Sequence, residues 1–417
     1  MSEQVRQPVR DAAGTTGKGP RLTGSGAQVA GIKDVFLGNL RSNGIMMVFG
    51  VLVIFLAATQ PMFLSPANLT NLVLQYSYVL ILAMGMLMVI VLAQIDLSVG
   101  SVICLVGAVV GVMMKQMDQP WWVCLLAGLA VGLLTGAWQG FWVAVVGIPG
   151  FIVSLGGMLI FRGLGQLILN YRSLSDLDPH YQFIANGFIN GVLGGQGYDV
   201  FTLVVIGIAI IGYAISEWRS RQGQIRYQQA VSPLPLFALK IVAVAAIGMF
   251  FAWRVSHDRG LPFILIILAA LILLYGTLTQ RTAFGRHIYA IGGNLNAAQL
   301  SGVKVKWVTF WVFVNMGLLS AVAGIVFSSR INASQPAAGT GFELDAIAAC
   351  FIGGASTTGG IGRVGGAMIG GLMMAVISNG MQLAGFGQAQ TTVVKGLVLL
   401  AAVAFDLVVK RFSTTTK

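Results

Sequence analysis

Charged residues are scarce in this chain. Asp, Glu, Lys and Arg make up only 9% of its 417 residues, hydrophobic residues make up 56%, and the mean hydropathy is +0.84. Soluble globular domains carry about 25% charged residues, so this sequence lacks the polar surface that a soluble domain needs. The composition therefore indicates an integral membrane protein.

Cysteine is also sparse, and its spacing indicates no site. Cys104, Cys124 and Cys350 each lie in an apolar segment, and no pair has the C-x-x-C spacing. This pattern argues against a disulfide framework and against a zinc site. We expect three small core residues, no metal and no cofactor.

Acidic residues are outnumbered by basic ones. The chain has 13 Asp and Glu against 25 Lys and Arg, which gives a formal net charge of +12. In a soluble protein such an excess suggests a nucleic-acid surface. Here the basic residues lie in short loops and tails, where the positive-inside rule for membrane proteins accounts for them. We therefore expect no nucleic-acid partner.

Two glycine patterns resemble nucleotide-binding motifs but lack the necessary context. Residues 360–365 (GIGRVG) match G-x-G-x-x-G, yet they join two apolar segments and do not follow a strand of a βαβ unit. Gly17-Lys18 is preceded by Ala12 where a P-loop has Gly, and is followed by Gly19 where it has Ser or Thr. The chain therefore has no P-loop, and residues 360–365 are interpreted as tight backbone where helices approach closely.

The two ends of the chain are polar and are predicted to be tails. Residues 1–43 are rich in Gly, Ser, Thr and charge and have no apolar core, which predicts a disordered basic cytoplasmic tail. No apolar stretch with a small-residue cleavage site precedes Ile45, so we expect no cleaved signal peptide. Residues 44–410 form the predicted transmembrane domain, and residues 411–417 a short cytoplasmic tail.

Long apolar runs determine the predicted fold. A bilayer core requires about 20 apolar residues per helix, and several runs here are short or interrupted by Gly. We predict an all-α, polytopic membrane protein with about 10–12 transmembrane helices. The predicted segments are Ile45–Thr59, Tyr76–Ala93, Val99–Met114, Trp121–Val146, Ile152–Leu169, Phe201–Ile215, Leu236–Trp253, Phe263–Leu278, Val308–Phe327, Ile347–Gly354, Ala367–Leu383 and Val393–Val409.

Basic residues predict the orientation. Both termini and the connection Glu217–Leu234 are basic, so all three are expected in the cytoplasm, which an even number of crossings permits. The uncharged connection Gln60–Gln75 and the acidic connection Asn170–Asp199 are expected outside. The loop predicted over Phe284–Lys306 contains basic residues and no acidic one, so it is expected in the cytoplasm, where it would contact a soluble partner.

A few polar residues lie at membrane depth. Asp96 lies between two apolar runs, in QIDLSVGSV, where we expect a helix break. Two interpretations of Asp96 with Ser98 remain open: capping of the helix that starts near Val99, which we prefer, or a direct part in a translocation pathway. For Asn315, Asn379 and Gln382 we prefer interhelical hydrogen bonds over lining of a pathway.

The histidines and intramembrane carboxylates do not form a proton relay. His180, His257 and His287 all fall in predicted loops, whereas proton-coupled transporters use chains of ionisable groups at membrane depth. Asp406 and Lys410 are four residues apart near the C-terminus and are predicted to pair across one helical turn. Proton-coupled transport is therefore disfavoured.

Four sequence blocks occur in order along the chain: IDLSVGS (95–101), IPGFIVSLGGMLIFRGL (148–164), GRHIYAIGGNLNAAQLSGV (285–303) and QPAAGTGFELDAIAACFIGGASTTGGIGR (335–363). Together they resemble the permease subunits of bacterial ATP-binding-cassette (ABC) importers for monosaccharides such as ribose, xylose and galactose. The resemblance covers about Ile45 to Val409. It implies a non-enzymatic subunit of the bacterial inner membrane, which forms a homodimer and imports a monosaccharide by alternating access. The partners implied are a cytoplasmic ABC ATPase and a periplasmic sugar-binding protein.

The resemblance also implies a contact with the ATPase. Importer permeases carry a cytoplasmic EAA-x-x-x-G loop, and residues 296–302 (NAAQLSG) have this form with Asn in place of Glu. The Ala pair permits close docking and the Gly permits a sharp turn; the alternative is a merely solvated connection. The expected coupling residues are Gly285, Arg286, Ala290, Gly292, Asn294, Asn296, Ala297, Ala298 and Gly302.

Two further expectations follow from the same resemblance. Residues 330–345 are the expected docking platform for the binding protein, with Arg330, Glu343 and Asp345 as contacts, the two acids being free to pair with basic groups. The stretch from about Asn186 to Trp253 adds a helix pair beyond the ribose type, as in the longer xylose and multiple-monosaccharide permeases. Xylose or a related sugar is therefore expected. The alternatives are a nucleoside or a furanosyl signal as the substrate, or a secondary transporter or channel as the function. The sequence shows no aromatic platform with flanking carboxylates that would mark a sugar site.

Overall fold

The computed structural model describes residues 40–229 and 231–414, with side chains described from Met46 onward except at residues 402 and 405–414. The predicted N-terminal tail lies outside these residues apart from residues 40–43, which belong to the first helix. The side chains of Asp406 and Lys410 also lie outside the described set, so their predicted pairing stays a prediction.

Helices make up about three-quarters of the described chain and strands only a few residues, which confirms the all-α prediction. The first half contains α2 (Leu40–Thr59), α3 (Pro66–Val91), α4 (Val99–Lys115), α5 (Trp121–Phe141), the π-helix η1 (Trp142–Val146), α6 (Gly150–Ile168), β1 (Leu174–Ser175), α7 (Pro179–Asn186), β2 (Phe188–Ile189) and α8 (Val200–Arg226). The second half contains α9 (Leu234–Ser256), β3 (Leu261–Pro262), α10 (Phe263–Arg281), α11 (Ala283–Gly293), α12 (Leu295–Leu300), α13 (Val305–Ile331), β4 (Ala333–Ser334), α14 (Phe342–Ile352), α15 (Val364–Leu383) and α16 (Gln388–Thr414).

Every predicted apolar segment coincides with a helix, and the chain is a multi-pass membrane protein. Among the described residues, eight helices are long and apolar enough to span a bilayer: α3, α5 with η1, α6, α8, α9, α10, α13 and α15. The described part of α2 and the whole of α4 are shorter apolar helices. Together with α14 and α16 they account for all of the predicted segments.

The prediction of a spanning helix over Ile347–Gly354 is wrong. The helix at this place, α14, has 11 residues, which is about 16 Å at 1.5 Å per residue and roughly half of a bilayer core. Residues 353–363 continue as irregular backbone that packs on α3 and α11. Irregular backbone at membrane depth is tolerated where it is buried in protein, which explains why the apolar run is interrupted by so many glycines.

Three predicted connections also differ from the structure. The connection Phe284–Lys306 is mostly helical, because Thr282 and Asn294 cap α11 and α12 through their side chains. The connection Gln60–Gln75 is shorter than predicted, since Ser65 caps α3 and Pro66 begins it. The polar connection after α6 contains α7 and two short strands, which pair antiparallel as β1 with β4 and β2 with β3.

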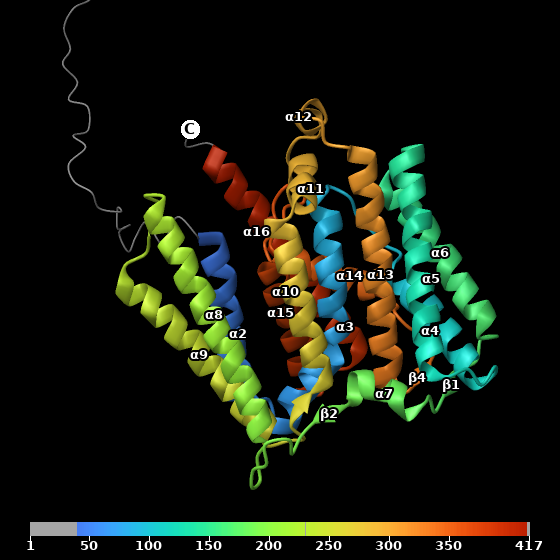
Figure 1. Ribbon diagram of the computed structural model, residues 1–417, viewed down its shortest axis with the longest axis horizontal. Helices are drawn as coiled ribbons and strands as arrows, with labels where there is room; N and C mark the ends of the chain where they lie inside the picture. The colour runs from blue at the N-terminus through green and yellow to red at the C-terminus, as the bar shows by residue number, and fades with distance from the viewer. Residues whose placement is uncertain (1–39, 230, 415–417) are drawn as a thin grey trace, which may run out of the picture.

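The helices form one bundle with two distinct ends (Figure 1). The start of α2, the turn between α8 and α9, the helices α11 and α12, and the end of α16 lie at one end, here called the α12 end. The helix α7 and the short strands lie at the opposite end, here called the α7 end. The described parts of the segments that the sequence assigned to the cytoplasm therefore lie at one end of the bundle.

The bundle is organised around α3 and has a lipid-facing periphery. In α3, 94% of the most apolar window is buried inside the protein, against 6% in each of α8 and α9. The helices α8 and α9 pack on each other as a hairpin, and α9 also packs on α3 (Figure 1). Their ion pair joins Glu217 to Lys240 at 2.9 Å. This hairpin is the helix pair that the sequence predicted as an addition.

Close packing of α5 on α13 depends on glycine. A Cβ atom at Gly317 of α13 would overlap the carbonyl oxygen of Gly132 and lie 2.7 Å from the Cα of Gly136, both on α5. Small residues that allow two backbones to approach closely are the usual basis of helix association in membranes. The α5–α13 contact therefore excludes even a methyl group at Gly317.

We expect Gly317→Ala to destabilise the protein by roughly 1–3 kcal/mol, because overpacking a close-packed contact costs about this much. The buried thiols of Cys104, Cys124 and Cys350 allow the thermal midpoint to be measured with a thiol-reactive fluorescent dye in detergent. The matched control is Gly156→Ala on α6, where a Cβ would meet no atom within 4 Å. Equal midpoints for the two variants would contradict the packing argument.

Candidate functional site

The polar connection at the α12 end is shaped by two residues that hold its backbone. The side chain of Asn294 accepts a hydrogen bond from the backbone N–H of Ala297 at 2.9 Å and so begins α12. Gly302 has φ of +80° just after α12, a conformation that favours glycine. Both predicted coupling residues therefore have a structural role in setting the position of α12.

The two alanines of the predicted Ala pair lie on different faces of the short helix α12, one facing the core and the other facing outward. Ala298 is 4% exposed and packs into the core, whereas Asn296 and Ala297 are exposed. Leu300, which the sequence reasoning passed over, is 91% exposed at the end of the helix, and Leu295 is 46% exposed. A leucine within an otherwise polar connection could have pointed to this position, but only the structure shows that Leu300 lies at the exposed end of α12.

The helix α11 is attached to the bundle by backbone contacts. A Cβ at Gly292 would overlap the carbonyl oxygen of Val91 at the end of α3, and the backbone N–H of Gly360 donates to the same oxygen at 2.9 Å. The hydroxyl of Tyr289 donates to the carbonyl oxygen of Gly362 at 2.7 Å. Burial raises the pKa of Tyr289 above its ordinary value, so this donor stays protonated. The backbone of residues 360–365 is therefore tight, in agreement with the sequence interpretation.

The other predicted coupling residues lie on α11 itself. Gly285 is buried, and a Cβ there would overlap backbone oxygens at the end of α10. Arg286 and Ala290 are exposed. The predicted set thus combines residues that hold α11 and α12 in place with residues that face outward.

Asp96 orders the helix break between α3 and α4. Its side chain is 1% exposed, and Oδ1 accepts hydrogen bonds from the backbone N–H of Ser98 at 2.8 Å and from its hydroxyl at 2.7 Å. Gln139 of α5 donates to the same hydroxyl at 2.5 Å. Ser98 is the N-cap of α4 and makes no side-chain bond to the first turn, so the preferred prediction that these side chains cap α4 is wrong. The carboxylate instead fixes the turn before the helix. The pathway role of Asp96 and Ser98 stays a prediction.

The amides at membrane depth join helices that are far apart in sequence. Asn379 of α15 and Asn68 of α3 exchange two hydrogen bonds of 2.9 Å. The hydroxyl of Tyr275 on α10 donates to Oδ1 of Asn315 on α13 at 2.5 Å. These are interhelical bonds of the kind that the sequence interpretation preferred, and Nδ2 of Asn315 has no partner among the described residues.

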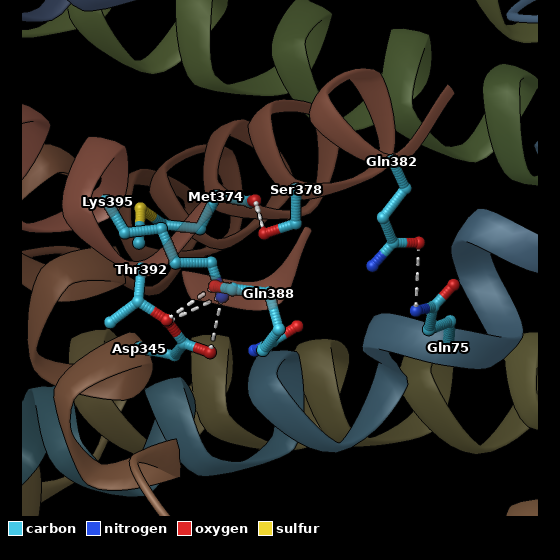
Figure 2. A network of polar contacts seen from close by, with 8 residues as sticks. All are labelled: Gln75, Asp345, Met374, Ser378, Gln382, Gln388, Thr392 and Lys395. Carbon is cyan, nitrogen blue, oxygen red and sulfur yellow. Dashed lines mark hydrogen bonds and ion pairs between the residues drawn. The ribbon is translucent and has the colours of Figure 1, made fainter. Parts of the chain in front are cut away.

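The predicted contacts for a soluble partner at the α7 end are only partly free. Lys395 of α16 donates to both carboxylate oxygens of Asp345 at 3.0 Å, and both side chains are less than a fifth exposed (Figure 2). The expectation of a free carboxylate at Asp345 is therefore wrong, because tertiary packing supplies a cation from 50 residues away. Glu343 and Arg330 are half-buried.

A metal centre is not indicated by the side chains that the structure describes. Within this part of the chain, no three His, Cys, Asp or Glu side chains are placed to hold a metal ion. The described candidate residues instead comprise the exposed helix α12 at one end and polar groups buried between helices.

Comparisons with known proteins identify a family of transport permeases. The family model described as branched-chain amino acid transport system / permease component matches residues 68–403. The xylose transport system permease protein XylH of Haemophilus influenzae is 38% identical over 85% of this chain and 93% of its own, and XylH of Escherichia coli K12 is 38% identical over 88% and 92%. The ribose import permease protein RbsC of Bacillus subtilis is 32% identical over 89% and 94%. No solved structure matches the chain.

We expect Gly292→Ala to loosen α11 from the end of α3 and to destabilise the protein by roughly 1–3 kcal/mol, because the added methyl group has no room beside the Val91 carbonyl. The adjacent Gly293→Ala is the matched control, since a Cβ there meets no atom within 4 Å. Hydrogen exchange of α11 should accelerate in Gly292→Ala alone. Equal exchange in both variants would refute the proposed attachment.

Proposed function

Because the chain belongs to the family of branched-chain amino acid transport system permease components, we propose that it is the membrane-spanning subunit of an ABC importer for a monosaccharide. The observation that carries this proposal is the 38% identity to xylose permeases over more than nine-tenths of their length. The family description names amino acids, whereas the relatives just compared are named for xylose and ribose. A sugar is therefore favoured over an amino acid.

Xylose is the preferred sugar and ribose the second candidate. Identity to the xylose permeases is 38%, against 32% for the ribose permeases. The hairpin of α8 and α9 also fits the longer xylose type that the sequence resembles. The subunit itself makes and breaks no covalent bond. The competing proposals are a nucleoside or a furanosyl signal as the substrate, or transport without partner subunits.

In the proposed importer, the α12 end lies in the cytoplasm of a bacterium and the chain in its inner membrane. Positive charge in short connections marks the cytoplasmic side, and the sequences of both tails add further basic residues at this end. The opposite end combines its basic residues with the aspartates of its connections. The basic side chains at the α12 end include Arg219, Arg221, Arg226, Arg281, Arg286, Lys304, Lys306 and Arg363.

The cytoplasmic partner is an ABC ATPase that binds α12. The chain has no P-loop of its own, so the energy source is a separate subunit. Leu300 and Leu295 expose apolar surface on a helix that faces water in this orientation, and exposed apolar surface of this kind is typical of a protein contact. The small, exposed Ala297 lets a partner approach α12 closely. Related loops have an acidic residue at the position of Asn296, so the contact of this chain lacks that charge.

The outer partner is a periplasmic sugar-binding protein that docks at the α7 end, where Arg330 and Glu343 are the remaining charged contacts from the predicted set. A second copy of the chain completes the transporter as a homodimer. Movement of the two ATPases shifts α12, and the dimer alternates between two packings of similar free energy whose balance the partners change.

The complete importer tests this function. Proteoliposomes containing the permease, its ATPase and the binding protein should import labelled xylose faster than ribose, and only with ATP. Import by the permease alone without ATP would support a secondary transporter or channel. A ligand other than a sugar held by the cognate binding protein would contradict the sugar assignment.

We expect Leu300→Glu to weaken binding of the ATPase by about 30-fold, because a buried interface anchor contributes about 2 kcal/mol or more. The measurement is the dissociation constant of detergent-solubilised permease and ATPase. Leu193→Glu is the matched control, since Leu193 is 54% exposed in the connection at the opposite end. Ala298→Arg is unsuitable, because Ala298 is buried and its replacement would disrupt α12 itself. Undiminished binding by Leu300→Glu would refute the docking role.

A further inference from the structure

A cavity of about 290 Å³ lies between α3, α14, α15 and α16. Gln382 is near the end of α15 and Gln388 begins α16, so the cavity lies toward the α7 end. Its volume is at the lower limit of small-molecule sites, which are typically about 300–1,000 Å³. Two residues that the sequence assigned to different roles, Asp345 and Gln382, lie on its wall together.

The two charged side chains that line this cavity have opposite signs and form an ion pair. The ion pair of Asp345 and Lys395 is bidentate, with both distances at 3.0 Å. Buried charges are tolerated where they are paired and hydrogen-bonded, and this pair leaves the cavity without net charge. The carboxylate still has lone pairs to accept further hydrogen bonds and the ammonium group has a third proton to donate. The pair therefore suits a polar ligand without net charge.

Amide side chains supply further polar groups that face the same space (Figure 2). Nε2 of Gln75 and Oε1 of Gln382 are 3.5 Å apart, a long and weak contact that a ligand hydroxyl can replace. The side-chain amide of Gln388 lines the cavity, and no described side chain or backbone group bonds it. An amide both donates and accepts hydrogen bonds, which is what hydroxyl groups on adjacent carbons require.

The remaining wall of the cavity is apolar and aromatic. Tyr78 and Phe342 are stacked with ring centroids 4.3 Å apart, and both line the cavity. Small-molecule sites combine such apolar walls with a few converging polar groups. A monosaccharide has the same division, with C–H groups on its faces and hydroxyls around its edge. The sequence did not reveal an aromatic platform beside a carboxylate. In the structure, Tyr78 of α3 and Phe342 of α14 form such a platform together.

We propose that this cavity binds a monosaccharide within the membrane domain, as a site that holds the sugar after its release at the α7 end. Gln75, Gln382 and Gln388 bind ligand hydroxyls, Asp345 with Lys395 forms the neutral polar wall, and Tyr78 with Phe342 forms the apolar one. This inference rests on the proposed function. It also changes the assignment of Asp345 from a surface contact for a partner to the wall of a ligand site.

Direct binding tests the cavity without any partner. The purified permease in nanodiscs should bind labelled xylose saturably, and Gln382→Leu and Gln388→Leu should each raise the dissociation constant roughly 3- to 10-fold, since each removes a hydrogen bond to the ligand. The matched control Gln166→Leu makes the same change on α6, outside the cavity, and should bind like the original protein. Displacement of xylose by unlabelled xylose but not by leucine would support a sugar site. Saturable binding of leucine alone, or equal affinity in all variants, would overturn it.

The complete importer separates failure of the cavity from failure of the proposed function. In the two cavity variants, sugar import should fall while ATP hydrolysis stimulated by the binding protein persists, because the α12 end is unchanged. Normal import by both variants overturns the cavity assignment and leaves the importer intact. Absence of ATP-driven sugar import by the unmodified complex overturns the proposed function instead.

Discussion

The carbonyl oxygen of Val91, at the end of α3, joins three parts of the molecule. It accepts a hydrogen bond from Gly360 in the backbone before α15, and Gly292 of α11 lies against it without room for a Cβ. The last carbonyls of a helix lack partners within the helix, and a bilayer supplies none. The contact satisfies this need and, by the same geometry, fixes α11 and α12 to the most buried helix of the bundle.

Hydrophobic runs predicted most of the helices, because a spanning helix must be apolar over nearly its whole length. The same rule failed at α14, where an apolar run of half that length continues as irregular backbone that packs on α3 and α11. It also failed at α11 and α12, which are short helices in a polar connection. Their caps, Thr282 and Asn294, are visible in the sequence, but similar residues occur throughout polar loops and did not distinguish these two.

Roles that depend on tertiary contacts were not available from the sequence. Ala297 and Ala298 look equivalent in the motif, and only the packing of α12 shows that one is exposed and the other buried. Asp345 lies in a stretch that reads as an outer loop, and its partner Lys395 is on another helix. By contrast, the preference for interhelical hydrogen bonds at Asn315 and Asn379 followed from the tendency of amides in membrane helices to bond across helices, which applies whatever the partner is.

The two ends of the protein are connected by the same pair of buried helices. At the α12 end, α3 contributes Val91 and α15 begins just after the Gly360 contact. At the α7 end, α3 contributes Gln75 and Tyr78 to the cavity and α15 contributes Ser378 and Gln382. Because Asn68 and Asn379 also bond α3 to α15 near that end, the pair is fixed at both ends. In the proposed transporter, α12 and two walls of the cavity are therefore attached to the same pair of helices.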